Sequence, residues 1–372
     1  MELILIILLK NFYYCAIMTT SRFPRKKTHN YAILCYMEDW LMQKQTVLPR
    51  WKGFNLLGAF VMNSPGKFEE EEFQMISDLG FDFVRLPLNY TFWIDYNDPF
   101  EINEGKLSIV DNCVSWGEKY GIHVNVALHR APGYSVAGDR VEPFNLWTDA
   151  EALEAFKLHW TTMAKRYKGI SSEKVSFNMV NEPAGVSPEA HLKVMRETTR
   201  AIHSIDPDRL TLCDGLNYGN LPQVDIANLA AENVAQSCRA YIPGGVTHFR
   251  ALWVDRKRNF PEAKWPGGYA DDGLWDTERI FLHYGAWAAL AQNYNMGVHC
   301  GEGGCFNMTP HDVTLRWMED VLDSLKTYNI GIALWNFKGG FGILDSERSD
   351  VDYVDYKGHK LDKKMLDLLK KY

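Results

Sequence analysis

The chain has 372 residues, of which 46% are hydrophobic and 23% charged, and its formal net charge is −7 at pH 7. Its length and apolar content are those of a globular protein with a large core. The charge balance argues against a nucleic-acid-binding protein, because basic stretches such as residues 22–27 are short. Aromatic residues make up 13%, which fits either core packing or stacking on a ligand.

The N-terminal region, residues 1–45, does not fit the pattern of the rest of the chain. Two apolar stretches, 3–9 and 12–18, are separated by Lys10 and Asn11, so neither reaches the ~20 residues of a membrane-spanning helix. As a secretory signal the region lacks a basic start and a clear cleavage site. Alternatively, translation begins at Met18, Met37 or Met42. We predict a tail that is signal-like or non-native and no stable membrane insertion. A signal would make the protein secreted or periplasmic; without one it would be cytoplasmic.

One pattern repeats along residues 46–372. Short apolar and β-branched runs, typical of buried strands, alternate with longer segments of helical period. The strand-like runs are 53–60, 81–87, 123–128, 175–180, 210–214, 235–241, 297–301 and 331–336. The helix-like segments are 69–79, 107–120, 149–168, 188–204, a short one near 222–231, 276–294, 311–327 and 361–371.

Cap signals support these boundaries. Ser187 and Pro188 predict a helix start, because Ser is a favoured cap and Pro fits the first helical position. Gly80 and Gly121 end helices just before strands. Eight strand–helix units without a linker predict an α/β fold, a single-domain (β/α)8 TIM barrel. A doubly wound open sheet is the alternative, but no G-x-G-x-x-G motif follows the first strand.

The cysteines and histidines indicate neither a metal site nor a redox motif. The seven cysteines include no CxxC pair, a pattern that favours reduced, buried thiols. A disulfide between Cys300 and Cys305 is the alternative. The eleven histidines are scattered and include no H-E-x-x-H motif. We therefore expect no metal and no cofactor.

Two Glu residues end strand-like runs, where the chemistry of a (β/α)8 barrel is located. Glu182 stands between Asn181 and Pro183, so a sharp turn would direct its carboxyl group, and Glu302 is surrounded by glycines that permit close approach to a ligand. Cleavage of a glycosidic bond requires one carboxyl that holds a proton and one that stays ionised; a separation of ~5–5.5 Å would mean retention. A capping or salt-bridge role for each Glu is the alternative.

Six longer motifs make the interpretation more specific. In chain order they are FVRLPLNY, VNVALHRAPG, FNMVNEP, CRAYIPGGVTH, HCGEGG and ALWNFKGGFGILDS. Together they resemble glycoside hydrolase family 5 over roughly residues 48–372. The resemblance implies a barrel with catalytic Glu residues on strands four and seven, and a β-linked polysaccharide or oligosaccharide as the substrate.

The resemblance implies a role for each matching residue. Glu182 resembles the catalytic acid/base and Glu302 the nucleophile. Arg85, on the second strand, resembles the Arg that supports the nucleophile, and its positive charge would favour the ionised carboxylate.

Four further residues match positions that contact the substrate or the nucleophile. His129 resembles the His on strand three that hydrogen-bonds in the site. Asn181 resembles the residue that binds the sugar 2-hydroxyl, a contact that strengthens in the transition state. Tyr241 resembles the Tyr that donates to the nucleophile. Trp335 resembles the platform under the sugar undergoing cleavage, with a core role as the alternative.

One position departs from the family pattern. The family usually has His-x-Tyr at the end of strand six, whereas this chain has Arg239-Ala240-Tyr241. Arg is permanently charged and bulkier than His, so the hydrogen bonds around the acid/base and the incoming sugar are in doubt, and the departure hints at a different substrate range.

We expect a retaining endo-β-1,4-glucanase, with a xylanase, a mannanase or a bifunctional glucanase/xylanase as alternatives. A catalytically inactive carbohydrate-binding barrel is the alternative from another class. The segment 242–275 is unusually long and contains Trp253, Trp265 and Tyr269. Because long loops are usually functional, it is predicted to form one wall of a substrate cleft.

Overall fold

The structure is a computed structural model that describes residues 48–61, 67–138, 141–254, 261–270 and 273–372. The predicted tail, residues 1–45, lies outside the described residues, so its assignment stays a prediction. Within the described ranges, no helix combines the length and the apolar character of a membrane span.

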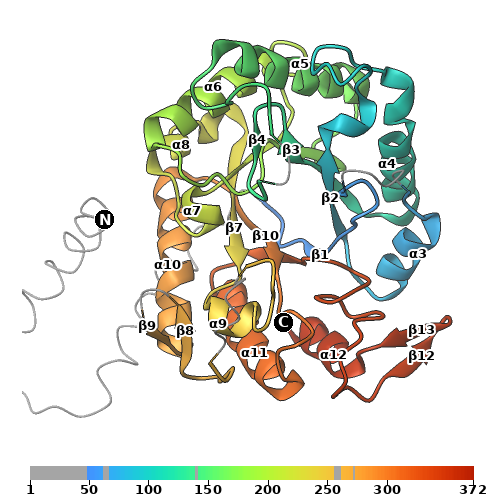
Figure 1. Cartoon of the computed structure of the whole chain (residues 1–372), viewed down its shortest axis with the longest axis vertical. Coiled ribbons are helices and arrows are strands. Elements are labelled where there is room, and N and C mark those ends of the chain that lie inside the picture. The colour runs from blue at the N-terminus through green and yellow to red at the C-terminus, as the bar shows by residue number, and fades with distance from the viewer. Residues whose placement is uncertain (1–47, 62–66, 139–140, 255–260, 271–272) are drawn as a thin grey trace, which may run out of the picture. The chain divides into compact units, whose positions relative to one another are not determined.

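A closed barrel of eight parallel strands forms the centre of the fold (Figure 1). Neighbouring strands follow the order β2-β1-β11-β10-β7-β6-β5-β3, and pairing of β2 with β3 closes the circle. The barrel strands are β1 (Lys52–Asn55), β2 (Phe83–Asn89), β3 (His123–Ala131), β5 (Val175–Asn178), β6 (Thr211–Asp214), β7 (Val234–Ala240), β10 (Val298–Gly303) and β11 (Gly331–Leu334). Each overlaps one of the eight strand-like runs, so the predicted TIM barrel is confirmed.

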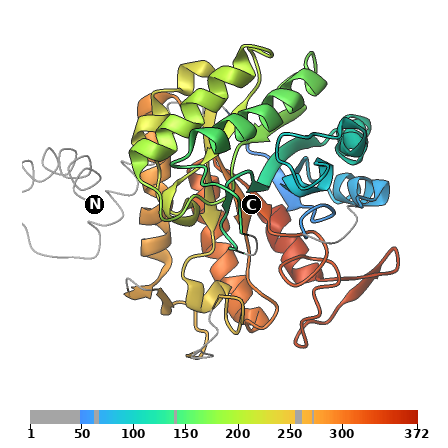
Figure 2. The same ribbon diagram turned by 45° about the horizontal axis from the view of Figure 1, so that its top comes forward.

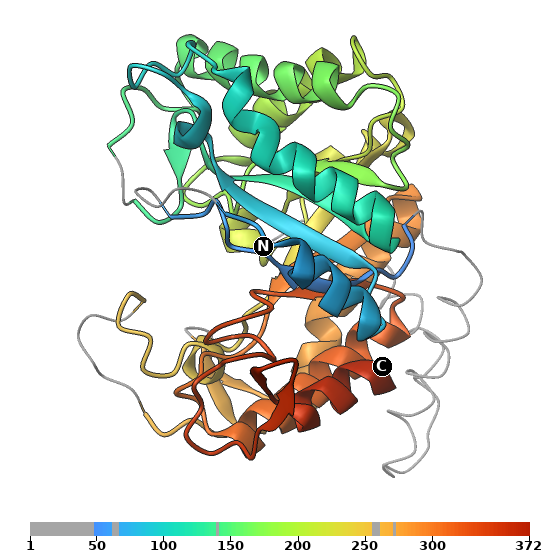
Figure 3. The same ribbon diagram turned by 90° about the vertical axis from the view of Figure 1, so that its right-hand side faces the viewer.

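Helices surround the barrel, as two further views show (Figures 2 and 3). They are α3 (Glu70–Asp78), α4 (Ser108–Tyr120), α5 (Ala150–Tyr167), α6 (Pro188–His203), α8 (Val224–Ala227), α10 (Thr277–Tyr294), α11 (His311–Thr327) and α12 (Lys363–Lys371). Only the segment predicted near 222–231 differs, because it contains the single turn of α8 and the 3-10 turn η3 (Ala230–Glu232). With helices outside and side chains inside, strands such as β2, β3 and β7 are buried along their whole length.

Shorter elements lie in the connections. They are η1 (Tyr90–Trp93), η2 (Glu104–Leu107), β4 (Tyr134–Ser135), α7 (Leu216–Gly219), α9 (Gly244–Thr247), β8 (Gly268–Ala270), β9 (Gly273–Trp275), β12 (Val354–Tyr356) and β13 (His359–Leu361). The predicted cap residues act as expected. The side chain of Ser187 accepts a hydrogen bond from the backbone N–H of Ala190 at the start of α6, and Gly121 ends α4 in the left-handed conformation.

The barrel interior is aromatic where the strands begin. The rings of Trp51 and His123 stack with centroids 3.8 Å apart, and Phe83 lies 4.4 Å from His299. Burial lowers the pKa of His123 to about 4 and that of His299 to about 3, so both rings are neutral at pH 7. The charged side chains of the candidate site lie at the opposite end of the barrel, where the strands end.

The cysteines in the described part of the chain are reduced. Cys113, Cys213, Cys238, Cys300 and Cys305 are all buried and free. The alternative of a disulfide between Cys300 and Cys305 is therefore wrong, and these thiols pack as small apolar groups.

Candidate active site

The seven predicted site residues lie on six different strands or on the residues that directly follow them. They are Arg85 in β2, His129 in β3, Asn181 and Glu182 after β5, Tyr241 after β7, Glu302 in β10 and Trp335 after β11. Six of them belong to the C-terminal half or end of their strands, and Arg85, in the first half of β2, reaches Glu302 with its long side chain, so the seven residues meet at one rim of the barrel.

Glu302 is buried at this rim, with only 2% of its surface exposed. The pairing of β10 with β7 shifts by one residue between Cys300 and Glu302, a bulge of the kind that redirects a side chain beside an active site. Arg85 donates from Nη1 to Oε1 of Glu302 at 2.6 Å, and the Tyr241 hydroxyl donates to Oε2 at 3.2 Å. Both carboxylate oxygens are therefore held in fixed positions.

Three asparagines orient Arg85, which is buried. Its Nε donates to Oδ1 of Asn178 at 2.8 Å, Nη1 to Asn55 at 3.0 Å and Nη2 to Asn181 at 3.0 Å. Asn55 in turn donates to the backbone carbonyls of β10 and β11. Neutral partners leave the positive charge of Arg85 directed at Glu302.

Glu182 lies in a tight turn that follows β5. Its φ is +49°, a left-handed conformation that is uncommon for residues other than glycine. Two contacts hold the turn: the backbone N–H of Glu182 donates to Oδ2 of Asp214 at 2.8 Å, and the Tyr134 hydroxyl donates to the Glu182 carbonyl at 2.7 Å. Such strain persists only where the surroundings enforce it, and it is common at active sites.

Arg239 lies between the two glutamates. Its Nε donates to Oε1 of Glu182 at 3.2 Å, and its Nη2 is 3.5 Å from Oε1 of Glu302. The same Nη2 donates to Asn181 at 2.9 Å and forms an ion pair with the fully buried Asp214. One guanidinium therefore contacts both glutamates.

The charges of this cluster balance only when one carboxyl carries a proton. Glu182, Glu302 and Asp214 contribute three carboxyls, whereas Arg85 and Arg239 contribute two permanent positive charges. Burial, and then repulsion from Glu302, raises the pKa of Glu182 to about 8. At neutral pH Glu182 is therefore the protonated carboxyl, and the buried cluster is electrically neutral.

Two polar atoms in the site have no hydrogen-bond partner among the described residues. They are Nδ2 of Asn181 and Nδ1 of His129. The oxygen of the Asn181 amide is already bonded to both arginines, so its NH2 group is free to donate to a ligand. Burial, reinforced by Arg85, lowers the pKa of His129 well below its usual value, and the ring is therefore neutral.

Trp335 lies partly exposed beside these groups. Its ring contacts Phe60 edge-on at 5.3 Å and His129 at 5.4 Å between centroids. The position leaves part of the ring surface available for stacking on a sugar.

In the described part of residues 242–275, some of the aromatic residues predicted to form a cleft wall are exposed and one is not. Trp253 is 58% exposed and Tyr269 54% exposed. The Trp253 ring packs near Phe341, which in turn contacts Tyr241, so Trp253 extends the aromatic surface of the site. Trp265, by contrast, is buried and donates from its indole nitrogen to a carboxylate of α11; its predicted place in the wall is wrong.

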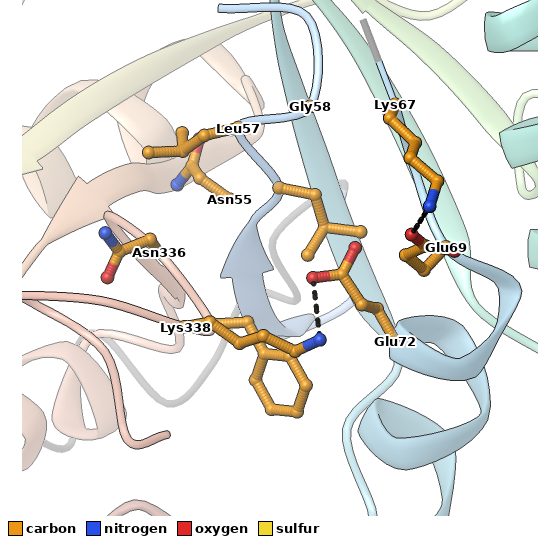
Figure 4. A pocket seen from close by; sticks show the side chains of 10 residues that line it. Asn55, Leu57, Gly58, Lys67, Glu69, Glu72, Asn336 and Lys338 are labelled. Atoms are coloured by element: carbon orange, nitrogen blue, oxygen red, sulfur yellow. Dashed lines mark ion pairs between the residues drawn. The ribbon is translucent and has the colours of Figure 1, made fainter. Parts of the chain in front are cut away.

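A pocket of about 220 Å³ adjoins the site, between the loops after β1 and β11 and the start of α3 (Figure 4). Lys338 and Glu72 form an ion pair of 3.5 Å there. Oδ1 of Asn336 is buried and has no hydrogen-bond partner in the described ranges. Asn55 lines the pocket and also binds Arg85, so the pocket and the site share a wall.

Several residues of the site were not predicted. Asn55, Asn178 and Asp214 position the charged groups. Tyr134, which the sequence suggested only as a residue lining the cleft, supports the Glu182 turn. Asp214 carried a usable signal, because it ends the predicted run 210–214 and the strand tips of a barrel carry its chemistry. In the part of the chain that the structure describes, no group of His, Cys, Asp or Glu has the arrangement of a metal site; the expectation of a metal-free site stays a prediction.

Comparisons with known proteins agree with this geometry. The family described as Cellulase (glycosyl hydrolase family 5) matches residues 42–340. Endoglucanase C of Acetivibrio thermocellus is 26% identical over 305 residues, which cover 76% of this chain and 88% of the relative. Cellodextrinase A of Ruminococcus flavefaciens is 26% identical over 262 residues, which cover 68% of this chain and 73% of the relative.

Solved structures give the same result. The crystal structure of a glycoside hydrolase is 37% identical, with a TM-score of 0.82, and the match covers 87% of this chain and 99% of that one. An endoglucanase of Thermotoga maritima, 22% identical with a TM-score of 0.70, covers 86% of this chain and 96% of that one; it supports the fold alone. Because the family match covers most of the sequence, the chain belongs to glycosyl hydrolase family 5.

Proposed function

We propose that the chain is a retaining endo-β-1,4-glucanase in which Glu182 is the acid/base and Glu302 the nucleophile. One observation carries the proposal: both glutamates contact the guanidinium of Arg239, but only Glu302 also forms an ion pair with Arg85. Glu302 forms an ion pair with Arg85, whereas burial and repulsion raise the pKa of Glu182 to about 8. Such a difference between two carboxyls is how glycosidases assign the acid and the nucleophile.

The proposed reaction has two steps. Glu302 attacks the anomeric carbon while Glu182 gives its proton to the leaving glycosidic oxygen, which forms a glycosyl ester and frees one end of the chain. Glu182, now ionised, then takes a proton from water, and the resulting hydroxide equivalent displaces Glu302. The unpartnered Nδ2 of Asn181 supports a hydrogen bond from this residue to the sugar 2-hydroxyl.

β-1,4-Glucan is the proposed substrate because the relatives that match most of this chain include endoglucanases. Membership of family 5 makes the chain a glycoside hydrolase and disfavours the alternative of an inactive binding barrel. Xylan and mannan stay alternatives; one Thermotoga maritima structure of similar fold contains a mannotriose substrate.

The decisive assay measures reducing-sugar release from carboxymethyl cellulose, barley β-glucan, xylan and mannan, with Glu182→Ala and Glu302→Ala as controls. Viscosity falling faster than reducing ends appear would identify endo cleavage. Proton NMR of the first products would show the β-anomer if the reaction is retaining. Release from xylan or mannan alone would replace the proposed polymer, and an α-anomer would overturn the double displacement.

The pH profile is expected to report the Glu182 proton. Because the acid must be protonated, kcat/KM should fall as pH rises through about 8, by about tenfold per unit. The measurement is kcat/KM on soluble β-glucan across neutral and alkaline pH, at substrate concentrations well below KM. A profile that stays flat well above pH 8 would contradict the assignment of Glu182 as the acid.

Trp335→Ala is expected to lower kcat/KM by about 10- to 100-fold, because it removes the ring proposed to stack on the sugar, a burial of about 1.5–3 kcal/mol. Trp335→Phe is the matched control and should keep most of the activity, since it retains an aromatic face. Steady-state kinetics on β-glucan test this pair. Equal losses in both variants would indicate that Trp335 serves mainly in packing.

A further inference from the structure

Arg239 stands where the family usually has a neutral His, and the structure around it is shaped for an arginine. The residue is fully buried, and its Nη1 donates to Oγ of Ser237 at 2.9 Å and to the Cys238 carbonyl at 3.0 Å. A Cβ on Gly219, which has φ of +74°, would lie 2.6 Å from Cγ of Arg239. A Cβ on Gly301 would lie 3.0 Å from Nη1 of Arg239. Both glycines therefore leave room for the long side chain.

Asp214 is the counterpart of this arginine. Its Oδ2 accepts from Nη2 of Arg239 and from the backbone N–H of Glu182, and its Oδ1 accepts from Asn178 at 2.9 Å. Asp214 is fully buried, and a buried charge requires a partner of opposite charge. Asp214 thus links the position of Arg239 to the turn that presents Glu182.

Arg239 and Asp214 together keep the charges of the site balanced before and after the first step. Before the first step, Glu302 and Asp214 are negative, Glu182 is protonated, and the two arginines balance the two carboxylates. After the first step, Glu302 is an uncharged ester and Glu182 has given up its proton. The cluster is again balanced, now by Glu182 and Asp214 against Arg85 and Arg239. Without Asp214, the extra arginine would leave both states with a net positive charge.

We propose that Arg239 and Asp214 form a charge-compensated positioning pair, in which Arg239 contacts both glutamates and Asp214 offsets its charge so that Glu182 keeps its proton until the first step. The inference rests on the proposed function of Glu182 and Glu302. Neither residue of the pair is a catalytic residue in this scheme, because both act through the glutamates.

The groups that face Glu182 come from several elements. They are Arg85 in β2, Tyr134 in β4, Asp214 in β6, Arg239 in β7, Tyr241 directly after β7 and Glu302 in β10. Burial, the largest cause, raises the pKa values of both tyrosines, so they stay neutral at the pH values of interest. Besides burial, the proton on Glu182 therefore depends on the four charged side chains.

The test compares four proteins: wild type, Asp214→Asn, Arg239→Gln and the double variant. Removing the negative charge of Asp214 should move the alkaline limb of kcat/KM to lower pH, and removing the positive charge of Arg239 should move it to higher pH, each by about one unit or more. The double variant restores the charge balance. The alkaline limb of its kcat/KM profile should therefore lie close to that of wild type, although its kcat is reduced. Asp312→Asn, an exposed site on α11, is the control for a remote charge change and should leave the limb in place.

A second readout does not depend on the substrate. Protein labelled with ¹³C at the glutamate carboxyl carbon is titrated by NMR, and Glu182→Gln identifies the Glu182 signal by its disappearance. In this titration too, the pKa of Glu182 is expected to fall in Asp214→Asn and to rise in Arg239→Gln. Arg239→Lys, which keeps the charge but not the fork of donors, should hold the titration near its wild-type position while kcat falls.

The outcomes separate the two proposals. If wild type cuts none of the polymers but the NMR titrations shift in opposite directions, the charge pair stands and the proposed function fails. If wild type is active while both single variants titrate as wild type does, or shift in the same direction, the pair has only a structural role and the inference is overturned. Circular dichroism and thermal unfolding identify a variant that does not fold. If a single variant does not fold, the Glu182 titrations of Arg239→Lys and of the double variant test the inference instead.

Discussion

Replacing Glu302 by Gln is expected to lower kcat/KM on β-glucan by at least ~10³-fold. The amide has nearly the shape of the carboxylate, so the contacts with Arg85 and Tyr241, at 2.6 and 3.2 Å in the native site, lose charge rather than geometry. It is a poor nucleophile, so no glycosyl ester forms. The loss should appear in kcat, because the removed interaction belongs to the transition state.

Chemical rescue distinguishes a missing nucleophile from a damaged site. Glu302→Ala creates space beside Arg85, and added azide should then attack an activated aryl glycoside from the vacated side. The product would be a glycosyl azide of inverted configuration. Rescue without inversion, or a Glu302→Gln variant within about tenfold of wild type, would exclude Glu302 as the nucleophile.

The barrel could be predicted because several independent features of the sequence indicated the same fold. Strand runs, helical segments and caps such as Ser187 all fell close to their structural positions, since a parallel barrel buries its strands on both faces and therefore gives continuous apolar runs. The first strand was predicted too long. It ends at Asn55, whose side chain donates to backbone carbonyls of β10 and β11.

Roles in the site were predicted only for residues that lie in one of the six sequence motifs. Arg85, Tyr241 and Glu302 lie in recognisable motifs, and their contacts follow from parallel pairing at one rim. Asn55 and Asp214 lie in none of these motifs, and Asn178 lies in FNMVNEP but was assigned no role; the part of these residues in the site arises from contacts between residues up to 279 positions apart in the chain. The sequence also showed that Arg239 replaces the His that the family usually has. That Asp214 balances the charge of Arg239, however, depends on a contact between two separate strands.

Trp265 illustrates a different limit. From the sequence alone, an aromatic residue in a long loop fits an exposed cleft wall and a buried packing position equally well. The residue that it contacts in the structure distinguishes the two. Its indole N–H donates to Asp320 at 2.8 Å, which satisfies the polar edge of a ring that is otherwise buried.

Glu182→Gln is expected to lower activity in proportion to the basicity of the leaving group. On β-glucan, whose leaving sugar needs a proton, kcat should fall by about 10³-fold. On a dinitrophenyl glycoside, whose leaving group needs none, the first step should stay close to wild type and the glycosyl ester should accumulate, because the second step also needs Glu182 as base. A burst of dinitrophenol followed by a slow steady rate would report this state.

The matched comparison is Tyr134→Phe, which removes the hydroxyl that donates to the Glu182 carbonyl but leaves the carboxyl in place. This variant should lose activity on both substrates by similar, smaller factors, because it loosens the turn without removing the proton donor. A Glu182→Gln variant that is equally slow on both substrates and shows no burst would exclude Glu182 as the acid. Asp214 would then be the other carboxyl within reach of Arg239, and its full burial beneath the turn would have to open for a sugar to meet it.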